Sequence, residues 1–189
     1  MLKLLKLLKS REVRWAMAYI SVAVTANYTA LWFVPLPFGM IALGTALFGI
    51  TFTARDYVHR LGRPKVYTMI FVAAFFSAVL VWLGQTPWRI IIASVSAIIL
   101  AEATDTEIYQ AFINRTWIVR VMASNAVSIP LDTILFNTIA FLGVFSIPLM
   151  VSIVTGEVIV KYIIGLIVAF VRFEKGKLQV FSKSKPVLE

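Results

Sequence analysis

The sequence contains no cysteine and a single histidine, His59. A disulfide, a thiolate metal site and a cysteine nucleophile are therefore excluded, and a conventional zinc site lacks its usual ligands. The phosphate-binding pattern GxxxxGK[ST] and the serine-hydrolase pattern GxSxG are also absent. We therefore expect no enzyme, no cofactor and no metal site. An intramembrane enzyme that uses carboxylates is the alternative, but no pattern favours it.

Charge is scarce as well. Charged residues make up 14% of the chain, against about 25% in an average soluble domain. Apolar residues make up 60% and the mean hydropathy is +0.90. This composition predicts an all-α membrane protein with one domain. The net charge of +9 does not indicate nucleic acid, because the basic residues lie between the apolar stretches and at the two ends.

Six stretches approach the length of about 20 mostly apolar residues that a membrane-spanning helix needs. They cover residues 15–34, 38–58, 66–83, 88–113, 117–144 and 147–171. We therefore predict a bundle of six transmembrane helices within residues 15–173. A short amphipathic basic helix at residues 1–14, suited to an anionic membrane surface, precedes it, and a polar cytoplasmic tail at residues 174–189 follows.

Lysine and arginine predict the orientation. Sixteen of them lie in the N-terminal arm, after the second and fourth stretches, and in the tail, whereas Arg89 stands alone on the other side. The positive-inside rule then places both termini in the cytoplasm, in a multi-pass protein of the cytoplasmic (inner) membrane. His59 is expected to be exposed in the connection after the second stretch, with no role.

Acidic residues inside or at the ends of these stretches are the main functional signal. They are Asp56, Glu102, Asp105, Glu107, Asp132 and Glu157. An ionised carboxylate near the bilayer centre costs about 2.5–3.5 kcal/mol even on a lenient scale. We therefore expect these groups to face the protein interior or a wet cavity, where a polar solute would be handled.

The fourth and fifth stretches carry polar side chains at helical spacing. Glu102 and Asp105 are three residues apart and share a helix face; they can share a proton, or each can pair with a cation from another span. Asn125, Ser128 and Asp132 form one stripe, as a solute site or as a contact that holds helices together. Pro130 frees a backbone carbonyl beside them.

Three further positions leave alternatives open. Glu157 and Lys161, four apart, can neutralise each other, or Lys161 can reach Asp132 or Asp105 from another helix. Asp56 lies beside Arg55, in a solvated ion-pair cluster or a gate. Asn27 is an isolated amide in the first stretch that can both donate and accept.

Five motifs occur in an order that resembles one family. They are Asn27–Tyr28, the run from Phe52 to Asp56 followed by an arginine and Gly62, Glu102 with Asp105, Ser124 to Asp132–Thr133 with Phe136, and Glu157 with Lys161. This order resembles the queuosine-precursor transporters, also called the vitamin-uptake-transporter (VUT) family, over about residues 19–170. The chain departs in having Glu102 where an amide is common, and in a tight connection between the third and fourth stretches.

The resemblance implies an importer of 7-deazaguanine bases such as 7-cyano-7-deazaguanine or 7-aminomethyl-7-deazaguanine. A carboxylate suits such a base because it accepts two adjacent N–H bonds at once. The expected partners are the base and the lipid bilayer, without nucleic acid, and a homodimer is left open. The substrate-binding residues that we expect are Asn27, Phe52, Glu102, Asp105, Asn125, Ser128 and Asp132. Those expected to gate or to pair charges are Asp56, Glu157 and Lys161.

Two other classes compete with a self-sufficient transporter. The chain can be the substrate-binding subunit of a vitamin or nucleobase importer driven by a separate ATPase module, with the glycines of the second stretch as a docking surface. It can also be a membrane scaffold that transports nothing. Uptake by the chain alone distinguishes a self-sufficient transporter from the ATPase-dependent subunit. Thermal stabilisation of the protein by a deazaguanine disfavours the scaffold.

Overall fold

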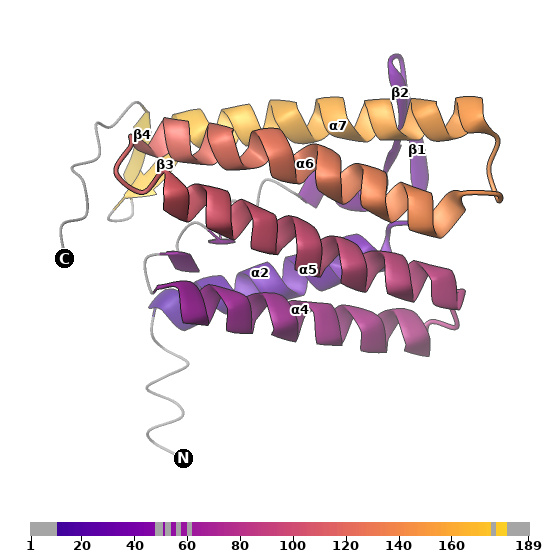
Figure 1. Ribbon diagram of the computed structural model, residues 1–189, viewed down its shortest axis with the longest axis horizontal. Coiled ribbons are helices and arrows are strands. Elements are labelled where there is room, and N and C mark those ends of the chain that lie inside the picture. The colour runs from indigo at the N-terminus through magenta and orange to yellow at the C-terminus, as the bar shows by residue number, and fades with distance from the viewer. Residues whose placement is uncertain are drawn as a thin grey trace.

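The computed structural model describes residues 11–47, 51, 54–55, 58–59, 62–174 and 177–180. Five α-helices make up most of this part of the chain (Figure 1). They are α2 (Arg11–Tyr28), α4 (Arg63–Leu83), α5 (Trp88–Ala111), α6 (Trp117–Phe141) and α7 (Ile147–Phe170). The shorter elements are β1 (Phe33–Leu36), β2 (Gly39–Ala42), the 3-10 helix η1 (Leu43–Leu47), β3 (Val171–Glu174) and β4 (Lys177–Val180).

The long helices form where the sequence predicts them. Helices α4 to α7 begin and end within three residues of the expected third to sixth stretches. Helices α4 and α6, together with residues 147–167 of α7, are long and apolar enough to cross a membrane. Every 18-residue window of α5 holds at least three charged residues, and α2 begins with three within its first turn. Among the described residues, three of the six predicted spanning helices are therefore supported by length and composition.

The first two expected spans differ from the prediction. Helix α2 ends at Tyr28, and the chain then forms an antiparallel hairpin in which Phe33 pairs with Ala42 and Leu36 with Gly39. Residues 39–47 are thus strand and 3-10 helix, where we expected a straight α-helix. Pro35 and Pro37 favour this outcome, because proline lacks the N–H that continues a helix. A second hairpin joins β3 to β4, so the expectation of an all-α fold is also corrected.

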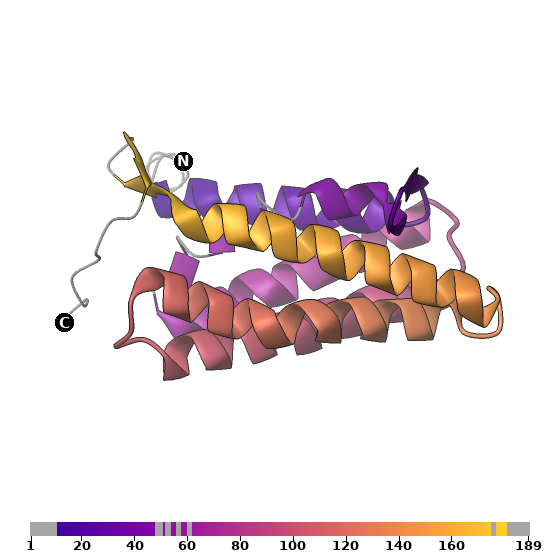
Figure 2. The same ribbon diagram turned by 90° about the horizontal axis from the view of Figure 1, so that it is seen from above.

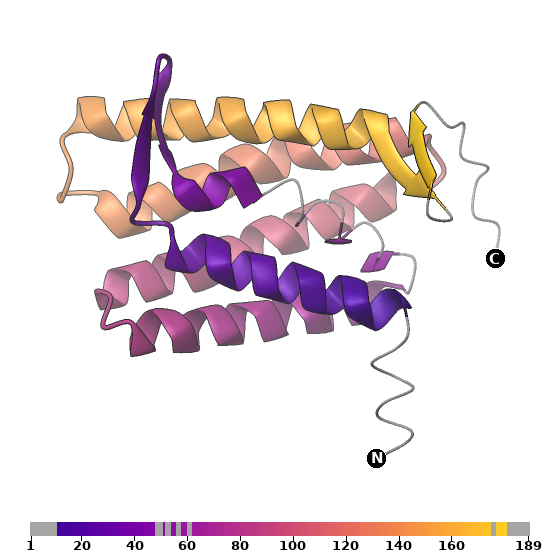
Figure 3. The same ribbon diagram turned by 180° about the vertical axis from the view of Figure 1, so that it is seen from behind.

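Helix α5 is central to the bundle. It packs between α4 and α6, while α2 packs on α4 and α7 on α6. Figure 3 shows η1 entering the bundle between α2 and α7, and Figure 2 shows the β1–β2 hairpin at the end opposite β3 and β4. The chain therefore reaches the middle of the bundle from the hairpin end before α4 begins.

Glycine lets the hairpin and η1 approach the helices closely. A Cβ on Gly156 of α7 would lie 2.6 Å from the carbonyl oxygen of Met40, and one on Gly44 would lie 2.2 Å from that of Ala26. Gly39 has a φ of +150°, and a Cβ there would lie 3.1 Å from the Cα of Gly156. Gly39 and Gly44 are thus used for packing inside the protein. These two glycines are therefore not available as a docking surface for an external ATPase module, whereas Gly49, the third glycine of the second stretch, lies outside the described residues.

Helix α6 continues through Pro130 as one element. Proline cannot donate to the carbonyl four residues earlier, which belongs to Ala126. The hydroxyl of Tyr162 on α7 donates to that carbonyl oxygen at 3.0 Å. The carbonyl freed by the proline is therefore satisfied by a neighbouring helix, as membrane helices commonly manage it.

Large apolar side chains cover the outside of α4. Phe71, Phe75, Trp82 and Leu83 are all more than half exposed. The opposite face of the same helix is buried, with Val66 and Ala73 fully enclosed. An outer face of this kind suits contact with lipid tails, and it agrees with a multi-pass membrane protein.

Candidate functional site

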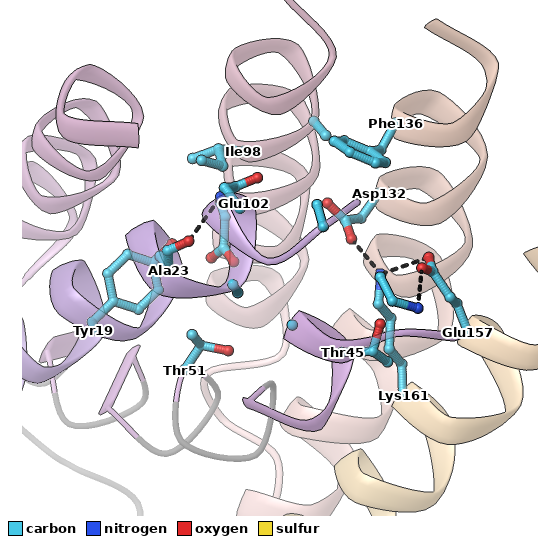
Figure 4. Close-up of a pocket in the computed structure, with 16 residues that line it drawn as sticks. Tyr19, Ala23, Thr45, Thr51, Ile98, Glu102, Asp132, Phe136, Glu157 and Lys161 are labelled. Atoms are coloured by element: carbon cyan, nitrogen blue, oxygen red, sulfur yellow. Dashed lines mark hydrogen bonds and ion pairs between the residues drawn. The ribbon is translucent and has the colours of Figure 1, made fainter. Parts of the chain in front are cut away.

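A cavity of about 80 Å³ lies inside the bundle, between α2 and η1 on one side and α5, α6 and α7 on the other (Figure 4). A single water needs about 10–15 Å³, so the cavity has room for several. Four charged side chains lie in its wall: Glu102, Asp132, Glu157 and Lys161. The polar remainder comes from Tyr19, Asn27, Thr45 and Thr51, and Phe136 supplies an aromatic ring.

The first charged cluster is centred on Arg55. One nitrogen of its guanidinium lies 3.1 Å from Glu102 Oε2, and the other lies 3.1 Å from Asp105 Oδ2 and 3.4 Å from Asn125 Oδ1. Ser128 donates to Asp105 Oδ1 at 2.7 Å. Asp105 is fully buried, and the side chain of Arg55 is 2% exposed. Of the two alternatives for Glu102 and Asp105, the structure shows pairing with a cation from another segment.

The second charged cluster is centred on Lys161. Its Nζ donates to Asp132 Oδ2 at 2.8 Å and to Thr133 Oγ1 at 3.0 Å, and lies 3.7 Å from Glu157 Oε2. Figure 4 shows Lys161 with both carboxylates at one end of the cavity. The spacing had left open whether Lys161 pairs within α7 or reaches α6. It does both, with the shorter distance to Asp132.

Glu157 ties this cluster to the hairpin. Its Oε1 accepts a hydrogen bond from the backbone N–H of Ala42 at 3.2 Å, and its Oε2 accepts one from the amide of Asn137 at 3.2 Å. Ala42 is the last residue of β2. The hairpin position and the charged wall of the cavity are therefore linked by a single buried carboxylate.

Asn27 lies at the cavity with its amide turned partly toward its own helix. Its Nδ2 donates to the carbonyl of Ala23 at 2.8 Å and, at 3.5 Å, to Ser77 of α4. Both bonds use the nitrogen. Within the described part of the chain, no hydrogen bond reaches its side-chain oxygen. An oxygen acceptor is thus left for a solute.

The expected site residues fall into three groups. Asn27, Glu102 and Asp132 line the cavity, and so do Glu157 and Lys161. Asp105, Asn125 and Ser128 lie behind the wall, held by Arg55 and by each other. Phe52 and Asp56 lie outside the described residues. Whether any of them binds a solute remains a prediction.

Sequence reasoning missed two features of the site. Arg55 was assigned to a cytoplasmic ion-pair cluster, yet it organises two of the expected acids. Tyr19, 1% exposed, also belongs to the site, because it lines the cavity together with Glu102. The helical spacing of Tyr19, Ala23, Ala26 and Asn27 on one face of α2 was the available signal.

His59 is buried, contrary to the expectation that it is exposed. Its ring stacks on Tyr109 with 4.3 Å between the centroids. The guanidinium carbon of Arg120 lies 5.2 Å from the centroid of the Tyr109 ring and 6.0 Å from the centroid of the Trp117 ring. Burial, reinforced by the charges of Arg55 and Arg120, lowers the pKa of His59 to about 3. This histidine is therefore neutral at physiological pH.

Residues 82–173 match a family model whose description is "Putative vitamin uptake transporter". The match covers α5, α6 and α7 and thus seven of the ten expected site residues: Glu102, Asp105, Asn125, Ser128, Asp132, Glu157 and Lys161. It confirms the resemblance to the vitamin-uptake-transporter family for this part of the chain, and it indicates a membrane transporter of a vitamin-like substrate. No curated protein and no solved structure gives a significant match.

Proposed function

We propose that the protein imports a queuosine precursor, a 7-deazaguanine base, across the cytoplasmic membrane, and that the cavity is its substrate site. The observation that carries this proposal is the position of Glu102 and Asp132. Both line one cavity, from neighbouring helices that lie within the stretch similar to vitamin uptake transporters.

The chemistry of the wall fits the edge of a guanine-like base. Such a base presents a ring N–H beside an exocyclic amine, and a carboxylate accepts both bonds together. Glu102 and Asp132 both line the cavity, which supports this role for either of them. The free amide oxygen of Asn27 accepts one further N–H, and the ring of Phe136 offers a flat surface on which a base can stack.

Residues behind the wall act by positioning. In this conformation Asn125 accepts a hydrogen bond from Arg55, and Ser128 donates one to Asp105. We therefore assign them to holding Arg55, which in turn fixes the orientation of Glu102. Second-layer contacts of this kind keep a binding group in one rotamer.

The same architecture suggests how access alternates. Helices α5, α6 and α7 form one wall of the cavity, whereas α2 and η1 form the other, together with Ala42 of β2. The hairpin is held by the Ala42–Glu157 hydrogen bond. A movement of the hairpin relative to α7 would open the cavity at that end, in the manner of alternating access around a fixed central site.

Uptake by the purified chain in liposomes tests the proposal. We expect accumulation of labelled 7-cyano-7-deazaguanine or 7-aminomethyl-7-deazaguanine without any ATPase partner, and inhibition by the unlabelled base. The double variant Glu102→Gln with Asp132→Asn should abolish uptake. Glu107→Gln is the matched control, because Glu107 is an exposed acid on the same helix that pairs with Arg63 and Tyr67 outside the cavity.

Two results would contradict the proposal. One is the failure of every deazaguanine to bind or enter, with a correctly folded chain. The other is unchanged uptake in the double variant. Binding without uptake until an ATPase module is supplied would instead identify the substrate-binding subunit of a larger importer.

A further inference from the structure

The two charged clusters present the same polarity to the cavity. In the first, the side chain of Glu102 is 15% exposed while that of Arg55 is 2% exposed. In the second, the side chain of Asp132 is 20% exposed while that of Lys161 is 5% exposed. In both, the carboxylate is the more exposed partner of the pair, although Lys161 also lines the cavity. A solute inside the cavity therefore meets negative charge first.

The sum of the charges has the same sign. Among the described residues, each cluster holds two carboxylates and one cation: Glu102 and Asp105 with Arg55, and Asp132 and Glu157 with Lys161. With every group ionised, each cluster has a net charge of −1 and the two together −2. The remaining buried cation of the described residues, Arg120, lies against Tyr109 and Trp117 and does not line the cavity.

The inner carboxylates are already engaged. Asp105 faces Arg55 and Ser128, and Glu157 faces Ala42, Asn137 and Lys161. The outer carboxylates have capacity left. Lys161 donates only to Oδ2 of Asp132, and within the described part of the chain Oδ1 of Asp132 accepts no hydrogen bond. Glu102 accepts from Arg55 through Oε2, and its other carboxylate oxygen takes no part in that bond.

We propose that the cavity selects solutes that carry a positive charge and rejects anions, with Glu102 and Asp132 as the residues that determine this selectivity. The inference rests on the proposed transport function and narrows its substrate. A deazaguanine with a protonated aminomethyl group would gain a charge-assisted bond that a nitrile cannot make. A carboxylate at the same position would face two negative groups in a site of low dielectric.

Three ligands that differ only at the 7-position provide the test. Binding to the purified chain is measured for 7-aminomethyl-, 7-cyano- and 7-carboxy-7-deazaguanine, which are cationic, neutral and anionic at pH 7. We expect the cation to bind at least about tenfold more tightly than the nitrile, as one charge-assisted hydrogen bond allows. The anion should bind more weakly than the nitrile by a similar factor.

Variants then assign the selectivity to residues. Glu102→Gln and Asp132→Asn should each bring the ratio of cation to nitrile affinity toward one, because each substitution weakens binding of the cation more than binding of the nitrile. Because each cation keeps one carboxylate, neither substitution leaves an unpaired buried charge, so both variants should fold. Glu107→Gln removes the same charge from α5 outside the cavity and should leave the ratio unchanged.

The outcomes separate the two proposals. Failure of all three ligands to bind would overturn the proposed function. Binding of the nitrile equal to or tighter than that of the cation would overturn the charge selectivity alone. A cation preference that persists in both cavity variants would remove Glu102 and Asp132 as its cause.

Discussion

Arg55 is almost fully enclosed, with both ends of its guanidinium facing acids. Arg55 is the cation that pairs with Glu102 and Asp105 among the described residues, so its removal would leave both acids without that counter-charge. Breaking a buried ion pair by deleting one partner typically costs about 3–5 kcal/mol. We therefore predict that Arg55→Ala lowers the free energy of unfolding by about that amount, measured as a loss of thermal stability in detergent.

A surface pair on a neighbouring helix provides the control for Arg55. Arg63 also pairs with an acid, Glu107, but both side chains are about half exposed. Exposed pairs contribute about 0–1 kcal/mol, so Arg63→Ala should change stability little. Adding Asp105→Asn to Arg55→Ala should restore part of the loss. Equal small effects of Arg55→Ala and Arg63→Ala would contradict the role given to Arg55.

Spacing along the helices predicted several residue contacts correctly. Glu157 on the same helix and Asp132 or Asp105 on another helix were the alternative partners for Lys161, and the structure pairs it with both Glu157 and Asp132. Arg55 was misplaced because a straight helix from Phe38 would carry it about 26 Å, to the membrane surface. Because the hairpin precedes η1, the chain enters the bundle only at Leu43, and Arg55 lies inside the bundle beside Glu102 instead of at the membrane surface.

The β1–β2 hairpin is the element that the sequence did not reveal. Residues 33–42 form a short apolar run, and such a run cannot be assigned to helix or strand by periodicity alone. Only Pro35, Pro37 and Gly39 hinted at a break. The long helices were more predictable, because runs of twenty or more apolar residues between basic or proline-containing connections have few alternatives.

The close approach of the hairpin to α7 can be tested at Gly156. A Cβ there would lie 2.6 Å from the Met40 carbonyl oxygen, which is backbone and cannot swing away. We predict that Gly156→Ala displaces the hairpin and costs about 1–3 kcal/mol, with loss of the Ala42–Glu157 hydrogen bond. Thermal unfolding and uptake measure the two consequences.

Thr155 supplies the control for Gly156. It is the preceding residue on α7 and is exposed, so Thr155→Ala should leave both stability and uptake close to those of the parent protein. If Gly156→Ala behaves like Thr155→Ala, the hairpin is not packed on α7 as the structure has it. A stable Gly156→Ala variant with impaired uptake would assign the contact to transport.

At the scale of the whole molecule, both ends of the described chain lie at one end of the bundle. Figure 1 shows the start of α2 and the β3–β4 hairpin on the same side, and the connection between α5 and α6 beside them. The connection between α4 and α5 lies at the opposite end. This arrangement agrees with an even number of passes. The orientation in the membrane follows only from the basic residues and stays a prediction.

The absence of cysteine makes that orientation easy to measure. Single cysteines can be placed at Gln85, between α4 and α5, and at Asn114, between α5 and α6; both residues are exposed. The first connection lies at the end with one arginine and the second at the end rich in lysine and arginine. We predict that a membrane-impermeant thiol reagent labels Gln85→Cys in intact cells and Asn114→Cys only after the membrane is opened. The parent protein, without any thiol, gives the background. The reverse pattern would place both termini outside the cell, and the cavity would then open in the direction opposite to that proposed.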